Sequence, residues 1–328
     1  MSESTVPKIR FGMTDLYVTK LCQGTAFRTM PRSSNNDAGV AVLRYCLDIG
    51  INFFDSAIAY GWGGAEEALG KAISGRRDKA IICTKVPRFY EPSSDDAAGK
   101  DATFNQAYLE TQLEGSLKRL GTDYVDLFLL HSTDGITGPA EICSVMDSFV
   151  TSGKIRYWGV SNHPAAVVIE MQKTASAAGT STPAGIEDYY TVAGVAVTDD
   201  SRSRTRELER EMFPCVREFG VGVLAFSPMD QGHLAPGRKI EPGSPMERII
   251  VELDRVAEEL EVTRAEICVA WVIARPEVTS VLAGCESPEH VDQMLSGTSL
   301  EIPEECMKKL DEASNRFSTE MEKFNSSA

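Results

Sequence analysis

The sequence predicts an α/β protein folded as a single (β/α)8 barrel, and three observations support that fold class. Short apolar runs alternate with segments of helical periodicity along the chain, as in a parallel sheet covered by helices. Eight such runs occur in 328 residues, which is enough to close a barrel. Three consecutive runs also finish in a charged or titratable residue, namely Asp55, Lys85 and His131.

The main alternative fold is a doubly wound open sheet. That fold normally carries a G-x-G-x-x-G turn after its first strand. Here the first strand is followed by Gly24-Thr25-Ala26-Phe27-Arg28, which lacks the pattern. The chain also shows no linker or low-complexity spacer, so the prediction is one barrel domain over residues 1–328.

The first half of the chain supplies a hairpin and the first four strands. Extended pieces on both sides of Gly12 predict a hairpin over 9–18 that could plug the barrel floor. Strands are then predicted at 19–23, 51–55, 80–85 and 124–131. Helices are predicted at 37–49, 65–73 and 104–120, and Gly50 ends the first of them. A polar loop, 88–101, follows the third strand.

The second half of the chain continues the alternation. Strands are predicted at 155–160, 185–190, 221–226 and 278–282. Helices are predicted at 139–152, 165–175, 206–219, 246–260, 264–274, 288–295 and 303–313. An irregular stretch, 191–203, and a loop rich in Gly and Pro, 227–245, are the longest connections. The polar tail 315–328 is expected to be mobile at its end.

Composition argues against several classes of partner. The formal charge is 33 minus 48, or −15, which repels nucleic acid and anionic membranes. The start, Met1 to Lys8, has no apolar stretch of the kind found in signal peptides, and no run approaches the length of a membrane span. Eight scattered cysteines without a C-x-x-C pair are typical of reduced thiols. We therefore expect a cytoplasmic protein.

The polar residues at the strand ends are the best candidates for a functional site. The carboxyl ends of parallel barrel strands share one face, so Asp55, Lys85 and His131 should lie together there. Tyr60 follows Asp55 by five residues and precedes a glycine-rich segment. Taken singly, a helix-capping acid, a surface lysine and a packing tyrosine are commoner explanations. Their occurrence together at successive strand ends favours catalysis.

These four residues, with their flanking sequences, resemble the catalytic tetrad of the aldo-keto reductases. Further matching stretches are Gly50-Ile51-Asn52-Phe53-Phe54-Asp55, Thr84-Lys85, Ser116-Leu117-Lys118-Arg119-Leu120, Asp123-Tyr124-Val125-Asp126, Gly153-Lys154-Ile155-Arg156 and Gly159-Val160-Ser161-Asn162. The resemblance covers about residues 8 to 313. One motif alone is moderate evidence, whereas the ordered set is strong.

The resemblance implies a role for each member of the tetrad. Carbonyl reduction leaves charge on oxygen, and Tyr60 would supply the proton as a general acid. The neighbouring Lys85 cation would favour the phenolate and lower the pKa of Tyr60. Asp55 would hold Lys85 by an ion pair, and His131 would hydrogen-bond the carbonyl oxygen and orient it.

The resemblance also implies a nicotinamide dinucleotide bound along the strand mouths. The residues expected to contact it are Gly24, Thr25, Ala26 and Asp55 on the nicotinamide side, Ser161 and Asn162 at the carboxamide, Ser227, Gln231, Gly232 and Leu234 at the pyrophosphate, and Gly284, Glu286, His290 and Gln293 at the adenosine end. Backbone amides of the loop after strand seven could bind phosphate without positive charge. An ordinary long loop is the alternative interpretation.

Two departures from the family pattern bear on the cofactor. The family usually places a Gln on strand six, but this strand reads Ile186-Glu187-Asp188-Tyr189. After strand eight, the family normally has basic residues for a 2′-phosphate, and here Glu286 stands among no Arg or Lys. An acid there disfavours a 2′-phosphate and could accept from a ribose hydroxyl. NADP(H) remains the first expectation because most relatives use it, and NAD(H) is the alternative.

Aromatic residues near the strand ends are candidates for a substrate pocket. These are Trp62, Phe89 and Tyr90, together with Tyr189 and Tyr190. Such residues also commonly pack loops down, and both interpretations stay open. His163 and His233 are expected to be loop residues, and no set of metal ligands is evident.

The function expected is therefore that of an NAD(P)-dependent oxidoreductase acting on a small aldehyde, ketone or sugar, as a monomer or small homo-oligomer. The alternative from another class is a regulatory, cofactor-binding protein on the same scaffold, like the β subunits of potassium channels. Substrate and direction are not encoded in any motif.

Overall fold

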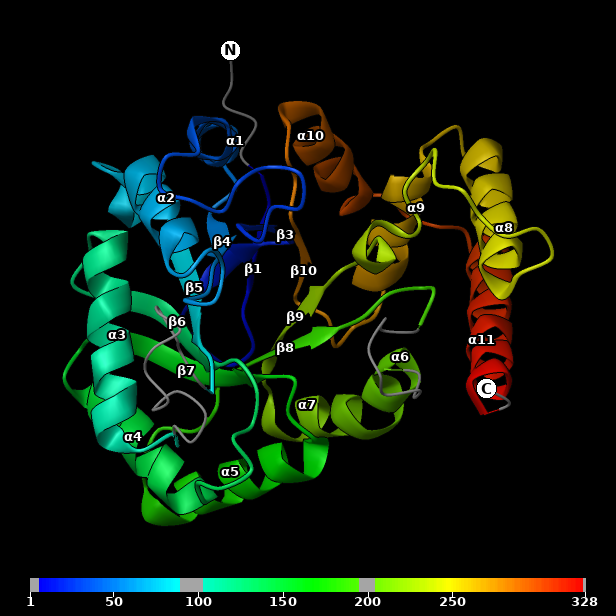
Figure 1. Ribbon diagram of the computed structural model, residues 1–328. Coiled ribbons are helices and arrows are strands. Elements are labelled where there is room, and N and C mark those ends of the chain that lie inside the picture. Colours follow the sequence, from blue (N-terminus) through cyan, green and yellow to red (C-terminus); the bar gives the residue numbers. More distant parts are fainter. Residues whose placement is uncertain (1–5, 89–102, 195–203, 327–328) are drawn as a thin grey trace.

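The computed structural model describes residues 6–88, 103–194 and 204–326, and its centre is a closed barrel of parallel strands (Figure 1). The strands are β3 (Leu21–Gly24), β4 (Phe53–Asp55), β5 (Ile81–Val86), β6 (Val125–Leu130), β7 (Ile155–Ser161), β8 (Gly185–Tyr189), β9 (Gly222–Phe226) and β10 (Ser280–Ala283). Each pairs in parallel with the next, and β10 closes the ring against β3. The predicted barrel is confirmed.

Helices surround the barrel on the outside, as Figure 1 shows. They are α1 (Asp37–Asp48), α2 (Gly64–Ile73), α3 (Gln106–Leu120), α4 (Pro139–Thr151), α5 (Ala165–Ala178), α6 (Arg204–Glu207), α7 (Phe213–Phe219), α8 (Pro245–Glu259), α9 (Arg264–Ile273), α10 (Pro288–Gly297) and α11 (Glu304–Ser326). Their apolar faces pack on the outer side of the strands and form the larger of two buried clusters. None of the described helices is both long and apolar enough to cross a membrane.

An antiparallel hairpin closes the amino-terminal end of the barrel, as predicted. Strands β1 (Lys8–Arg10) and β2 (Tyr17–Thr19) pair with each other. Phe11, next to β1, packs against Phe53 with their ring centres 5.7 Å apart. A methyl group on Gly222 would lie 2.5 Å from the Phe11 ring, so the floor needs a glycine there. Phe11 and the interior strand residues thus form the second, inner cluster.

Two of the sequence motifs serve the fold rather than the site. On β6, the buried Asp126 accepts hydrogen bonds from Arg77 and Arg156, which tie neighbouring strands at the amino-terminal end. Arg119 in α3 makes an ion pair of 2.7 Å with the fully buried Glu66 of α2. These motifs hold the helices and strands in register.

The structure differs from the prediction in two helical regions. A π-helical segment, Leu208–Met212, interrupts the helix predicted at 206–219. Pro214 follows it and has no N–H to donate, which accounts for the wider turn. The last helix also continues past 313, where a polar tail was expected. Phe317 in that extension is buried against α8, and Glu320 pairs with Arg248 at 2.5 Å.

Candidate active site

The strand ends of β4 and β5 bring Asp55 and Lys85 together inside the barrel mouth. Their side chains are 1% and 0% exposed and form an ion pair. The Lys85 ammonium also donates to the carbonyl oxygen of Ser56 at 3.0 Å. Its third close neighbour is Glu187 Oε2 of β8, 3.2 Å from Nζ. The predicted pairing of Asp55 with Lys85 is therefore present, with a second carboxyl beside it.

Tyr60 lies over this ion pair, in the turn between β4 and α2. The Lys85 Nζ atom is 5.1 Å from the centre of the Tyr60 ring. His131, just after β6, meets the same ring edge-on with ring centres 5.9 Å apart. The turn depends on Gly61, which has φ +61° and whose Cβ would lie 1.9 Å from the Arg32 carbonyl oxygen. All four predicted tetrad residues meet at one place.

The pKa values of the cluster follow from burial and from its charges. Burial lowers the pKa of the Lys85 ammonium, but Asp55 and Glu187 outweigh burial and raise it well above its usual value. Burial, with a smaller effect of Lys85, lowers the pKa of His131 to about 3, so the imidazole is neutral at pH 7. Lys85 is a permanent cation and His131 a neutral hydrogen-bonding group.

The pKa of Tyr60 differs from the simplest expectation. Lys85 does lower it, in the direction that the sequence predicted. Burial raises it more strongly, and Asp55 and Glu187 act in the same direction as burial. The pKa of the Tyr60 hydroxyl is therefore raised overall. The tyrosine is a protonated acid in this structure.

The end of β7 presents the residues expected at the nicotinamide carboxamide. Ser161 is buried, and Asn162 has φ 55°, a conformation that non-glycine residues rarely adopt. The Asn162 side chain donates to His131 O at 3.1 Å and to Ser161 Oγ at 2.8 Å. Its backbone N–H donates to Asp188 Oδ1 at 2.9 Å. Both amide protons are used, which leaves the amide oxygen as an acceptor.

Gly24, Thr25 and Ala26, which were predicted to contact the nicotinamide side of the cofactor, lie at the end of β3, and Thr25 is buried. The Thr25 hydroxyl donates to Ser56 Oγ at 2.9 Å, next to the Lys85 site. The backbone N–H of Thr25 donates to Asp55 O at 3.0 Å. These bonds fix the β3 loop to the β4 loop at the barrel mouth.

The loop after β9 is also shaped by unusual backbone conformations. Non-glycine residues with positive φ in the described chain are Trp62, Asn162, Ser227, Asp230, Gln231 and Glu261. All except the last lie after the carboxyl end of a barrel strand. Such conformations are costly and gather at functional sites. The backbone around Ser227, Gln231 and Gly232 is thus consistent with the predicted cofactor loop.

Leu234, and Tyr189 and Tyr190 at the end of β8, are more deeply buried than residues that line a binding site need to be. Leu234 is 0% exposed and belongs to the outer core, where its carbonyl accepts from Arg264. Tyr190 stacks on Trp271 in the same layer, which agrees with the packing interpretation of the two that the sequence left open. The Tyr189 hydroxyl donates to Asp230, which fixes the β9 loop to β8.

The adenosine-end residues follow β10. Glu286 accepts hydrogen bonds from the backbone N–H of Thr29 at 2.9 Å and from that of Arg28, and its carboxylate also accepts from the Thr29 hydroxyl. It therefore joins the loop after β3 to the loop after β10. The other predicted residues are exposed or half-buried, namely Gly284, His290 and Gln293.

The predicted substrate residues are only partly described. Trp62 is 56% exposed beside Tyr60, consistent with a residue at the mouth. Phe89 and Tyr90 lie outside the described residues.

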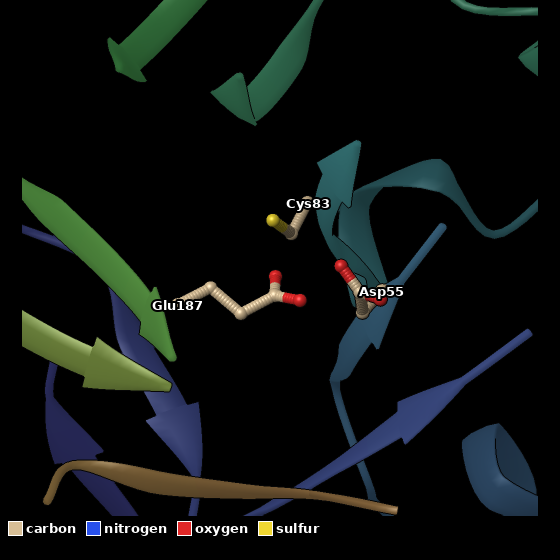
Figure 2. A group of neighbouring side chains, drawn as sticks. All are labelled: Asp55, Cys83 and Glu187. Atoms are coloured by element: carbon tan, nitrogen blue, oxygen red, sulfur yellow. The ribbon is translucent and has the colours of Figure 1, made fainter. Parts of the chain in front are cut away.

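Sequence reasoning missed Glu187 and Asp188 as members of the site. Glu187 reaches from β8 toward Asp55 on β4 and Cys83 on β5, as Figure 2 shows. The signal was available, because alternation along β8 places residue 187 on the inward face with Gly185 and Tyr189. The alternation could not predict that the Glu187 carboxyl reaches far enough into the barrel to contact Lys85.

Asp55, Cys83 and Glu187 each offer one atom of a kind that binds metal ions, and the three atoms lie within 4.8 Å of one another (Figure 2). The Lys85 ammonium contacts Asp55 and Glu187 where a metal ion would need these carboxyls, so neither residue is assigned as a metal ligand.

Comparison with known proteins gives matches over most of the chain. A sequence model described as the aldo/keto reductase family matches residues 20–315. The uncharacterized oxidoreductase YrpG of Bacillus subtilis is 30% identical over 92% of this chain and 94% of its own. A probable voltage-gated potassium channel subunit beta of Oryza sativa is 27% identical over 85% and 87%. The solved thermostable aldo-keto reductase Tm1743 superposes with a TM-score of 0.75, at 27% identity, over 93% and 99% of the two chains.

Proposed function

The chain belongs to the aldo/keto reductase family, and we therefore propose that it transfers a hydride between a nicotinamide cofactor and the carbonyl or alcohol carbon of a small aldehyde, ketone or sugar. The observation that carries this proposal is the packing of Tyr60 over the buried Lys85 ammonium, with His131 at the ring edge. We place the protein in the cytoplasm, as a monomer or small homo-oligomer.

The side chains have distinct tasks in this reaction. Tyr60 donates its hydroxyl proton to the carbonyl oxygen during reduction and takes a proton from the alcohol during oxidation. Lys85, a cation at all physiological pH values, stabilises the phenolate that remains. Neutral His131 donates one hydrogen bond to the substrate oxygen and so orients it. The bound nicotinamide supplies or accepts the hydride.

The residues at the strand mouths fit a nicotinamide ring with its carboxamide. Ser161 and the amide oxygen of Asn162 offer hydrogen-bonding groups whose geometry is fixed by His131 and Asp188. On the other side, the backbone of the β9 loop would receive the pyrophosphate. Burial raises the pKa of both Tyr189 and Asp230 in the same region, and the positive charge of nearby Arg28 opposes that rise.

The choice between NADP(H) and NAD(H) depends on Glu286. Its carboxylate would repel a 2′-phosphate, so Glu286→Gln should tighten NADPH binding about fivefold, corresponding to ~1 kcal/mol for a partly exposed charge. NADH binding should change less than about twofold, because it has no phosphate at that position. Fluorescence titration of the variant with each cofactor measures both values.

Glu301→Gln is the matched control, since it removes the same charge from an exposed position before α11. Equal gains for NADPH in both variants would show that only the overall charge matters. An unchanged NADPH affinity in Glu286→Gln would place the 2′-phosphate away from this carboxylate.

The function itself is tested by cofactor binding together with turnover. Trp62 is the useful reporter for binding, because Trp158 and Trp271 are fully buried in the outer core. We expect quenching with NADPH or NADH and cofactor-dependent reduction of 4-nitrobenzaldehyde. Binding without turnover on a broad panel of carbonyls and alcohols would favour the regulatory alternative. Binding of neither cofactor would refute both.

A further inference from the structure

The carboxyl of Glu187, on β8, lies in the interior of the barrel beside the Asp55–Lys85 ion pair. Its side chain is 3% exposed and extends across the barrel toward Asp55 (Figure 2). Oε2 lies 3.2 Å from Lys85 Nζ. Lys85 is therefore held between two carboxyls, one from β4 and one from β8.

The surroundings of Glu187 contain one cation and several acids. The titratable groups facing it are Asp55 on β4, Lys85 and Cys83 on β5, Cys22 on β3, and Tyr60 above them. The inner cluster adds apolar residues, with Leu129 on β6, Leu224 on β9 and Leu282 on β10, and the buried Ser161 on β7 lies in register with Glu187. Burial raises the pKa of both thiols, so the cysteines stay neutral. The net charge is set by the two carboxyls and the lysine.

The balance of charge requires one proton to be kept. If both carboxyls ionised, the buried cluster would carry a net negative charge, which is costly away from water. Burial raises the pKa of Asp55 as well, but Lys85 lies closer to Asp55 than to Glu187 and stabilises the ionised form of Asp55 more strongly. Burial and the Asp55 charge raise the pKa of Glu187 well above its usual value. Glu187 is thus the carboxyl that keeps the proton.

We propose that protonated Glu187 is a positioning residue of the catalytic cluster, which holds Lys85 from the β8 side and whose ionisation weakens the action of Lys85 on Tyr60. The proposal rests on the proposed function, because Tyr60 is the proton donor in that reaction. It adds a charge switch that is governed by one residue on β8.

The direction of the switch follows from the sign of the charges. While Glu187 is neutral, the positive charge of Lys85 and the negative charge of Asp55 cancel. The ammonium then stabilises the Tyr60 phenolate. When Glu187 loses its proton, a second negative charge lies below Tyr60 and opposes the phenolate. Alcohol oxidation, which uses the phenolate as base, is then slowed at alkaline pH. Glu187→Gln should abolish this slowing of alcohol oxidation, because glutamine is neutral at every pH.

The first experiment measures protonation without any substrate. Infrared difference spectra between wild type and Glu187→Gln should show, at pH 7, the carbonyl stretch of one protonated carboxylic acid in wild type only. Glu170→Gln, an exposed acid on α5, is the control and should leave that band unchanged. Absence of the band from wild type at pH 7 would overturn the proposal.

The second experiment measures Tyr60 directly. Phenolate absorbance is titrated with pH, and the Tyr60 contribution is taken as the difference from Tyr60→Phe. In Glu187→Gln, the phenolate fraction at a given alkaline pH should exceed that of wild type roughly tenfold, equivalent to one pH unit. Superimposable curves would mean that the charge of Glu187 does not reach Tyr60, and the proposal would fail.

Kinetics then separate positioning from simple packing. Glu187→Leu, which keeps the bulk and loses the polar contact, should lower kcat about tenfold with KM nearly unchanged. Glu187→Gln should restore kcat to near the wild-type value at pH 7. Equal losses in both variants would contradict the neutral role of Glu187. If Glu187→Leu does not fold, the glutamine variant still decides the question by the two spectroscopic measurements.

These readouts distinguish the two proposals. A protonated carboxyl and a shifted Tyr60 titration in a protein without turnover would refute the reductase function alone. Turnover that depends on Tyr60, with no acid band and no shift, would refute the role of Glu187 alone.

Discussion

Tyr60→Phe is expected to lower turnover by about two to four orders of magnitude, the usual contribution of a general acid or base. The phenyl ring keeps its packing against His131 and Lys85, so the fold and the cofactor site should be preserved. Cofactor affinity should therefore change less than about twofold. Turnover is measured by the absorbance of the reduced cofactor, and affinity by fluorescence titration of the same preparations.

Tyr17→Phe is the matched control, because Tyr17 is exposed on the hairpin at the opposite end of the barrel. Its turnover should equal that of wild type. If Tyr60→Phe also turned over at the wild-type rate, another group would have to donate the proton, and the assignment of the tetrad would be wrong.

Lys85→Met is expected to reduce the free energy of unfolding by about 3–5 kcal/mol at pH 8, the typical result of removing one partner of a buried ion pair. Methionine retains most of the bulk, so the loss comes from charge rather than from a cavity. Asp55 would remain buried without its cation, and Glu187 would remain beside it. Urea unfolding followed by circular dichroism measures the difference.

The loss of stability should depend on pH with a defined sign. In wild type, folding raises the pKa of Lys85. The Lys85 charge therefore contributes its full stabilisation to the folded state below pH 10.5, the unfolded pKa. This stabilisation is lost as pH rises from there through the folded pKa. In the variant, Asp55 must take up a proton on folding, and this uptake becomes easier as pH falls. The stability difference should therefore narrow from pH 8 to pH 5.

Lys173→Met, on the exposed side of α5, provides the comparison for loss of a lysine charge. It should change stability by less than about 0.5 kcal/mol at both pH values. A deficit for Lys85→Met that is equal at pH 5 and pH 8 would show that packing, not the unpaired carboxylate, causes the loss.

The fold and the tetrad could be predicted because they depend on simple periodicities. Strand alternation and parallel connections bring Asp55, Lys85 and His131 to one face of the barrel, whatever conformations the loops adopt. Tyr60 follows Asp55 by five residues and comes just before a glycine-rich turn, so its place near the strand end could also be expected. Such features repeat in every barrel of this kind, so few residues are needed to recognise them.

The remainder depends on contacts between distant segments, which no local pattern encodes. The carboxyl of Glu187 meets Lys85 across the barrel, and Glu286 meets the loop at Thr29, 257 positions away. The continuation of α11 depends on the burial of Phe317 against α8, although the tail reads as polar. The raised pKa of Tyr60 likewise reflects burial by the whole mouth, which sequence reasoning could not weigh against Lys85.

The ring closure between β10 and β3 has a consequence for biosynthesis. Val281 pairs with Leu21, a separation of 281 minus 21, or 260 positions. At 5–20 residues per second on the ribosome, the closing strand appears roughly 13–50 s after its partner. During that interval β3 is an unpaired edge, and such edges attract other chains. Nascent chains of this protein therefore expose one strand edge to other chains until translation is nearly finished.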